Sequence, residues 1–185
     1  LFGGLKGGLA IGTMFMMVAI SAMNGLSVAG MAIGATIALP EMLKRNYDKR
    51  MITGVVQAGS SLGILIPPSV VMVLYGMIAR QPVSKLWMAG ILPGLLMASL
   101  FLIYIYVRCK LQPELGPPLK KEEREVSTLE KIRLLKAGII PFLIFFFMTG
   151  LFLMGIASLV ECSAVGAFLA TLAAIYKRRF NKQVL

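Results

Sequence analysis

Residues 57–69 read Gln57-Ala-Gly-Ser-Ser-Leu-Gly-Ile-Leu-Ile-Pro-Pro-Ser69, and this stretch decides how the chain is expected to fold. It lies inside Met51–Ala79, a block that contains no charged residue. Two consecutive prolines remove two backbone donors and crowd the carbonyls of the preceding turn. Carbonyls freed within a hydrocarbon layer need protein, water or an ion as a partner. The stretch therefore predicts a broken transmembrane helix over 51–79, with one half ending near Gly63 and the other beginning near Ser69.

The two helix ends at this break suggest a binding site. Through the helix dipole, the C-terminal end near Gly63 favours a cation and the N-terminal end near Ser69 favours an anion. The alternative is a proline kink that binds nothing. Ser60 and Ser61 precede the break, and Pro67 begins the proline pair. These serine hydroxyls lie beside backbone groups that the break exposes, and unsatisfied backbone groups are costly in a membrane. We therefore favour a binding site over a simple kink.

The composition extends the membrane interpretation to the whole chain. The 185 residues are 58% hydrophobic with a mean hydropathy of +0.84, which is too apolar for an ordinary soluble domain. Four charge-free blocks exceed the roughly 20 residues that cross a bilayer. Beside Met51–Ala79 they are Gly7–Pro40, Leu86–Val107 and Ala137–Val160, and a shorter block covers Cys162–Tyr176. We therefore predict an all-α, polytopic membrane protein, with transmembrane helices at 86–107, 137–156 and 161–176.

The basic residues orient these helices. They cluster at Lys44–Arg50, Arg108–Lys136 and Lys177–Lys182, beside the ends of apolar blocks, as the positive-inside rule describes. Of the 19 Lys and Arg residues, only Arg80 and Lys85 fall outside in the resulting topology. Short loops offer no continuous basic face, so the net charge of +11 does not predict nucleic-acid binding. The expected location is the bacterial inner membrane.

The first apolar block is too long for one crossing. A single helix over Gly7–Pro40 would measure about 51 Å, well beyond a ~30 Å hydrocarbon core. We predict a re-entrant hairpin over 7–43 that enters from the cytoplasm and turns within Ser21–Ser27, since Asn24 and Gly25 accept turn conformations. Two full crossings would give the same charge pattern and remain the alternative.

The hairpin tip offers neutral oxygen ligands. Ser21, Asn24 and Ser27 carry oxygen-bearing side chains, and Gly25 lets backbone carbonyls turn inward. Such hard, uncharged ligands suit a monovalent cation such as Na⁺. We expect Na⁺ between tip and break, held by Ser21, Asn24 and Gly63. The alternative is a packing turn between helices, since small polar residues also join helices in membranes.

Three further features are interpreted structurally. Segment 108–136 is expected to be a cytoplasmic loop with an interfacial amphipathic helix, carrying Val126, Leu129, Ile132 and Leu135 on one face. Glu161 is a secondary binding candidate as a carboxylate at a membrane block, but Ser158 and Glu161 also fit a capping box, which we favour. Tyr75, Trp87, Tyr104 and Tyr106 lie near block ends, as interfacial aromatic residues do.

Catalytic chemistry finds no support in the sequence. Histidine is absent, and Cys109 and Cys162 form neither a metal-binding spacing nor a disulfide framework. The usual catalytic groups cannot be assembled, so no enzyme activity is expected. No cofactor is expected beyond Na⁺ as a coupling ion. The chain begins at Leu1, without an initiator Met or a signal peptide, and we interpret it as a fragment of a longer protein.

These motifs occur in an order that resembles a known family. The strongest part is Ala58–Gly76, AGSSLGILIPPSVVMVLYG, followed by Ala89-Gly-Ile-Leu-Pro-Gly94. The hairpin Ser21–Leu39 leading to Pro40-Glu-Met42 and Tyr47, and Glu161-Cys-Ser-Ala-Val-Gly166, follow the same order. The chain resembles the large membrane subunit of the tripartite ATP-independent periplasmic (TRAP) transporters.

The resemblance implies an elevator-type secondary transporter that is driven by a Na⁺ gradient. Its implied partners are a small membrane subunit and a periplasmic substrate-binding protein, and its implied substrates are C4-dicarboxylates, sialic acid and other organic acids. It also implies that tip and break form the first of two inverted half-sites. The matching positions are Ser21, Asn24, Gly25, Ser27, Gly63, Pro67 and Ser69. A sodium-coupled anion symporter of similar architecture, working without a binding protein, is the alternative.

The sequence departs from the family pattern in two ways. Family tips are commonly rich in Gly and Ser, whereas this tip carries Met23, Asn24 and Leu26. A second hairpin and a second broken helix do not occur in these 185 residues. We therefore expect that this chain alone does not transport.

Overall fold

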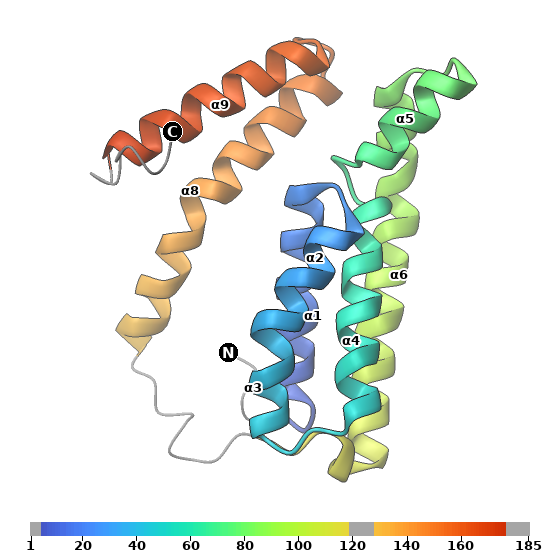
Figure 1. The fold of residues 1–185 in the computed structure, drawn as a ribbon, viewed down its shortest axis with the longest axis vertical. Coiled ribbons are helices and arrows are strands. Elements are labelled where there is room, and N and C mark those ends of the chain that lie inside the picture. Colours follow the sequence, from blue (N-terminus) through green and yellow to red (C-terminus); the bar gives the residue numbers. More distant parts are fainter. Residues whose placement is uncertain (1–4, 119–127, 177–185) are drawn as a thin grey trace. The chain divides into compact units, whose positions relative to one another are not determined.

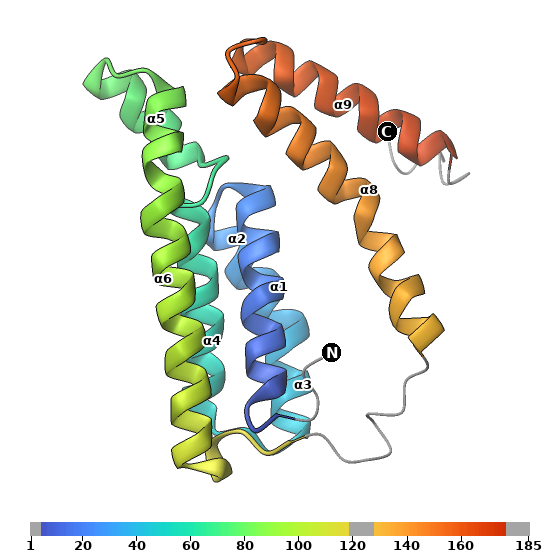
Figure 2. The same ribbon diagram turned by 180° about the vertical axis from the view of Figure 1, so that it is seen from behind.

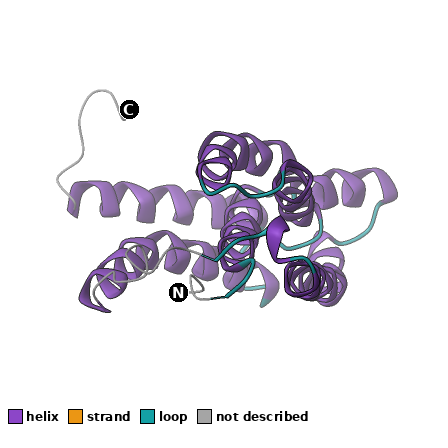
Figure 3. Cartoon of the chain, turned by 90° about the horizontal axis from the view of Figure 1, so that it is seen from below, coloured by secondary structure: helices purple, strands orange, loops and turns teal. Residues whose placement is uncertain are grey.

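The structure, a computed structural model, describes residues 5–118 and 128–176, with side chains over 5–118 and 138–175 (Figure 1). The chain divides into two compact units, Leu1–Val126 and Ser127–Leu185. Within the described residues every regular element is helical, and Figure 3 shows these helices joined by loops. The predicted all-α class is confirmed.

The first unit begins with a helical hairpin. Helix α1 covers Gly8–Asn24, and the returning arm consists of α2 (Ser27–Ile33), a π-helical turn (Gly34–Ala38) and α3 (Leu39–Lys44). The two views show this arm beside α1 (Figures 1 and 2). The π-helical turn is a local widening that the sequence did not predict. A Cβ on Gly34 would lie 2.7 Å from Met17 Sδ, so glycine lets the arm approach α1 closely.

The second half of this unit contains the interrupted helix and a long return helix. Helix α4 covers Lys49–Ser61, a 3₁₀ turn covers Leu62–Ile64, α5 covers Val70–Ala79 and α6 covers Val83–Leu111. A second 3₁₀ turn follows at Pro113–Leu115. Asp48 caps α4 by accepting hydrogen bonds from the backbone N–H groups of Arg50 (2.9 Å) and Met51 (3.2 Å), as an N-cap carboxylate does.

Helix α6 is longer than the predicted span of 86–107. Its N-cap is Pro82, and it ends where Pro113 restricts Gln112. Lys85 and Arg108 are part of the helix instead of its boundaries. Charge marks where an apolar block ends, but a charged residue does not end a helix.

Methionines are among the largest fully buried side chains in the core of the first unit. Met14 and Met17 of α1 and Met42 of α3 are at most 1% exposed. A Cβ on Gly59 of α4 would lie 2.5 Å from Met17 Cβ, so α1 and α4 approach closely at this glycine. Flexible, unbranched methionine fills the irregular gaps that such close helices leave.

Three segments meet at the end of the unit away from the hairpin tip. Gly7 N–H donates to Gly116 O (2.8 Å), and Asp48 N–H donates to Leu115 O (3.2 Å). Leu9 N–H donates to the hydroxyl oxygen of Tyr47 (3.3 Å). Burial raises the pKa of the Tyr47 phenol above its ordinary value. These contacts tie the start of α1 and the α3–α4 connection to the end of α6.

The second unit is a helical hairpin of α8 (Thr128–Leu153) and α9 (Leu159–Tyr176). Gly155 adopts a left-handed conformation (φ 70°) that reverses the chain after α8. Gly166 packs directly on Met148, where a Cβ would collide with its sulfur. The rings of Phe142 and Phe146 pack against each other along α8 in a tilted arrangement, with centroids 5.2 Å apart.

Helix α8 differs from the predicted arrangement. A separate interfacial helix before a transmembrane helix at 137–156 was expected, but α8 runs without interruption from Thr128 through Pro141 to Leu153. No turn-forming dipeptide separates the polar part of α8 from its apolar part. An internal proline such as Pro141 is tolerated in a membrane helix, because neighbouring helices can satisfy the backbone groups that it frees. The side chains of the expected amphipathic face lie outside the described residues.

One helix in the described part of the chain, α6, is long and apolar enough to cross a membrane. The other apolar helical stretches are shorter, at Gly8–Asn24, Val70–Ala79, Gly138–Leu153 and Leu159–Ile175. The apolar block Met51–Ala79 does not form one long helix because it divides at Ser61. Length alone therefore identifies fewer spans than the charge-free blocks predict.

Candidate functional site

The interruption between α4 and α5 spans residues 62–69. After the 3₁₀ turn, Leu62 O accepts hydrogen bonds from Leu65 N–H (3.1 Å) and Ile66 N–H (2.9 Å). The Pro67–Pro68 peptide bond is cis. Ser69 then caps α5, where its Oγ accepts a hydrogen bond from Met72 N–H (3.3 Å). One helix thus ends and another begins within eight residues, without a charged side chain between them.

The hairpin tip is a tight turn at Gly25 and Leu26. Gly25 ends α1 in the left-handed conformation (φ 65°), and its N–H donates to Ser21 O (2.9 Å). This is a common glycine C-cap. Leu26 is extended, and α2 begins at Ser27. The turn falls within the predicted tip, Ser21–Ser27.

Tip and interruption are joined through their backbones. Val70 N–H, at the start of α5, donates to Gly25 O (3.1 Å). A Cβ on Gly25 would lie only 2.6 Å from Pro68 O. Glycine is required here for two reasons, its positive φ and the close approach of the proline segment.

Ser21 lies at the centre of this junction. It is completely buried, and its Oγ has no hydrogen-bond partner among the described residues. Its neighbours are small: a Cβ on Gly63 would lie 2.8 Å from Ser21 O, and one on Gly30 would collide with Ser21 Oγ. The same Cβ on Gly30 would lie 3.5 Å from Ser60 Cβ. An unpaired buried hydroxyl is unusual, because leaving it unsatisfied costs free energy.

The structure thus brings Ser21 together with Gly63 and Ser60. It brings Gly25 beside Pro68 and the N-terminus of α5.

The remaining predicted site residues contribute differently. Asn24 is exposed, and its Nδ2 donates to Ile20 O in its own helix (2.8 Å). Ser60 and Ser61 donate to the carbonyls one turn earlier, Gln57 O (2.9 Å) and Ala58 O (2.8 Å). Among the predicted side chains, only the Ser21 hydroxyl is buried without a partner within the described residues.

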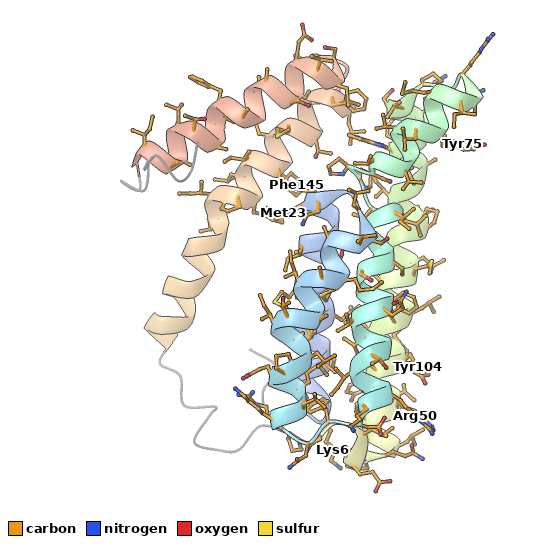
Figure 4. All side chains as sticks on the ribbon, viewed as in Figure 1. Lys6, Met23, Arg50, Tyr75, Tyr104 and Phe145 are labelled. Carbon is orange, nitrogen blue, oxygen red and sulfur yellow. The ribbon has the colours of Figure 1, made fainter. Side chains whose placement is uncertain are left out.

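The positions of three further predicted or neighbouring residues complete the site. Ser27 is half-buried at the start of α2, and Pro67 is buried. Met23, next to Asn24, is exposed at the tip, as Figure 4 shows at the end of α1.

Sequence reasoning missed two contributors. Trp87 was expected to be an interfacial aromatic residue, but it is 5% exposed and its Nε1 donates to Ser69 O (3.2 Å). It therefore holds the start of α5 from helix α6. Gly30 provides the space for Ser21, and its four-residue spacing to Gly34 is a small-residue packing signal that could have identified it.

Glu161 belongs to the second unit and acts as a helix cap. Its Oε2 accepts hydrogen bonds from the backbone N–H and the Oγ of Ser158, both at 2.7 Å. Ser158 Oγ in turn accepts from Glu161 N–H (3.3 Å). The favoured capping box is confirmed.

Comparison with known proteins supports the resemblance seen in the motifs. Residues 1–184 match the family model described as "Tripartite ATP-independent periplasmic transporter, DctM component". The C4-dicarboxylate TRAP transporter large permease protein DctM of Pseudomonas aeruginosa is 38% identical over 105 residues, which cover 57% of this chain and 25% of that protein. The ectoine/5-hydroxyectoine large permease protein UehC of Ruegeria pomeroyi is 37% identical over 106 residues, covering 57% and 24%.

A longer match extends into the second unit. The 2,3-diketo-L-gulonate TRAP transporter large permease protein YiaN of Escherichia coli is 30% identical over 173 residues, covering 92% of this chain and 39% of that protein. The chain therefore matches between about a quarter and two fifths of the length of these relatives. The family match covers nearly every residue, so this chain belongs to the DctM component family of the tripartite ATP-independent periplasmic transporters.

Proposed function

We propose that the protein containing this chain is the membrane subunit of a Na⁺-coupled secondary transporter that imports organic acids by an elevator mechanism. In this proposal it lies in the bacterial inner membrane as a multi-pass protein. The observation that carries the proposal is the junction of hairpin tip and interrupted helix, with the unpaired Ser21 hydroxyl at its centre.

The coupling ion fits the chemistry of this junction. The Ser21 oxygen is buried and can still accept a cation. Gly63 brings the end of the α4 segment against Ser21, and the carbonyl end of a helix carries partial negative charge. Na⁺ bound there as co-transported cargo would hold tip and interruption in one relative geometry. Asn24 would have to release Ile20 O before its side chain could take part.

The N-terminus of α5 supports the binding of an anionic substrate. A helix N-terminus attracts carboxylates through its dipole and its free N–H groups. In this structure Val70 N–H already donates to Gly25 O and Met72 N–H to Ser69 Oγ. A substrate carboxylate would therefore act mainly through the field of the helix end, and its binding would be sensitive to the position of the tip.

The names of the relatives support the substrate class and the partners. Relatives are named for C4-dicarboxylates and for 2,3-diketo-L-gulonate. A relative from Oleidesulfovibrio alaskensis is named isethionate TRAP transporter permease protein DctMQ. From these names we infer that the substrate is an organic acid. We also infer that the partners are a small membrane subunit and a periplasmic substrate-binding protein.

The test is uptake by the complete permease with its small subunit in proteoliposomes. We expect accumulation of a radiolabelled C4-dicarboxylate only with an inward Na⁺ gradient and an added periplasmic binding protein. Uptake that is unchanged when K⁺ replaces Na⁺ would overturn the coupling. Uptake that needs Na⁺ but no binding protein would instead support the second candidate, a symporter that works without one.

A further inference from the structure

A groove lies between α4 and α6, at the end of the first unit away from the hairpin tip. Its volume is about 850 Å³, and apolar side chains make up much of its wall. From α4 these include Met51 and Val55, and from α6 they include Phe101 and Ile105. In Figure 4, Arg50 and Lys6 lie at this end of the unit, and Met23 lies away from it at the hairpin tip.

Two arginines stand at one end of the groove. Arg50 is in the first turn of α4 and Arg108 in the last turn of α6, and both line the groove and are exposed. Asp48 also lines it, but its carboxylate accepts the backbone N–H groups that cap α4. The ion pair found among the described residues joins Arg45 and Glu41. The Asp48 carboxylate keeps its negative charge, but the two guanidinium groups outnumber it, so this end of an otherwise apolar groove is positive overall.

The floor of the groove contains open space. A Cβ on Gly54, which lines the groove from α4, would meet no heavy atom within 4 Å. Tyr104 lines the opposite wall and is exposed, as Figure 4 shows along α6. An occupant can thus lie against α4 without displacing protein atoms.

We propose that this groove binds one anionic phospholipid, with the phosphate between Arg50 and Arg108 and an acyl chain along the apolar wall. The inference rests on the membrane location and topology of the proposed function, but not on Na⁺ coupling. That topology places both arginines at the cytoplasmic surface, where basic pockets between helices bind anionic headgroups. A soluble anion would satisfy the arginines but would leave the apolar wall uncovered.

Native mass spectrometry of the complete permease in detergent tests this proposal. The probes are phosphatidylglycerol, phosphatidylcholine and glycerol 3-phosphate, each at equal concentration. We expect phosphatidylglycerol to be retained in preference to phosphatidylcholine, and glycerol 3-phosphate not to displace it. Equal retention of the two lipids would overturn the role of the arginines, and displacement by glycerol 3-phosphate would show a free-anion site instead.

Matched variants locate the bound lipid. The double variant Arg50→Gln/Arg108→Gln should weaken phosphatidylglycerol binding about 30-fold, as expected for two basic residues near a membrane surface. The control Lys44→Gln/Lys49→Gln removes the same charge from exposed residues that do not line the groove, and it should have little effect. Equal loss in both double variants would show a general charge effect and would overturn the proposal.

A variant that fills the groove with a larger side chain distinguishes a bound lipid from another part of the permease as the occupant. Gly54→Leu should reduce phosphatidylglycerol retention and leave the melting temperature nearly unchanged, whereas Gly12→Leu, with similar open space in α1, should change neither. If Gly54→Leu lowers the melting temperature sharply and leaves lipid retention intact, another part of the permease fills the groove, and the proposal is wrong. If the permease retains the lipid but transports without Na⁺, the proposed Na⁺ coupling is wrong and the proposed lipid site still stands.

Discussion

The Ser21 hydroxyl is buried without a partner, although an unsatisfied buried polar group costs about 1–3 kcal/mol. If its purpose is to bind an ion, Ser21→Ala should keep or raise the melting temperature of the permease. The same variant should raise the Na⁺ concentration for half-maximal uptake about tenfold, because hydrogen-bonding groups facing a charge contribute roughly 1.5–3 kcal/mol. Both quantities come from a thermal melt and a Na⁺ titration of uptake in proteoliposomes.

The control for Ser21→Ala is Ser99→Ala. Ser99 is exposed on α6 and its Oγ donates to Leu95 O, so this variant removes a hydroxyl of the same kind far from the junction. It should leave the Na⁺ titration unchanged. A normal Na⁺ titration in Ser21→Ala would remove Ser21 from the proposed ion site.

Gly63 tests the close packing of the same junction. Gly63→Ala would bring a Cβ within 2.8 Å of Ser21 O and 2.9 Å of Ser21 Cβ, and this overpacking should destabilise the fold by roughly 1–3 kcal/mol. Gly12→Ala is the matched change at a helical glycine with nothing within 4 Å, and it should be neutral or stabilising by up to about 1 kcal/mol. Equal melting temperatures for the two variants would contradict the contact between Gly63 and Ser21.

At the scale of helices, the interruption was predictable and the supporting contacts were not. Pro67 and Pro68 lack backbone donors whatever surrounds them, so the sequence alone predicts an interruption before α5, although α4 already ends at Ser61. Gly25 likewise indicates the turn. The role of Trp87 depends on α6 returning beside Ser69, which is a tertiary contact that local patterns do not contain. The unpaired state of Ser21 is tertiary in the same sense, since it follows from the small neighbours Gly30 and Gly63.

The limits of helices were predicted less well for a related reason. The spans were drawn from charge-free blocks, and α6 extends beyond its block at both ends to include Lys85 and Arg108. Long basic side chains reach water from inside a helix, so their positions carry little information on where the helix ends. Proline and glycine constrain the backbone itself, and the boundaries next to them are located more accurately.

Glu161 permits a test of capping against ion binding on helix α9. Glutamine also serves at this position of a capping box, so Glu161→Gln should leave melting temperature and uptake close to those of the unmodified permease. Ser158→Ala removes the two hydrogen bonds of the Ser158 hydroxyl and should destabilise α9 by about 1 kcal/mol. Loss of Na⁺-dependent uptake in Glu161→Gln, with normal stability, would show that the carboxylate charge itself is needed.

On the scale of the whole molecule, the topology makes a prediction that depends on the interrupted helix crossing the membrane. In a complete permease with Cys109→Ala and Cys162→Ala, Lys49→Cys should react with an impermeant maleimide only from the cytoplasmic side, and Lys85→Cys only from the periplasmic side. The basic residues beside α4 require the first result by the positive-inside rule. The second follows because α4 and α5 together lead from Lys49 to the connection before α6. Labelling of Lys85→Cys from the cytoplasm would mean that α4 and α5 enter and leave on one side, and the proposed half-site would then lack access from the periplasm.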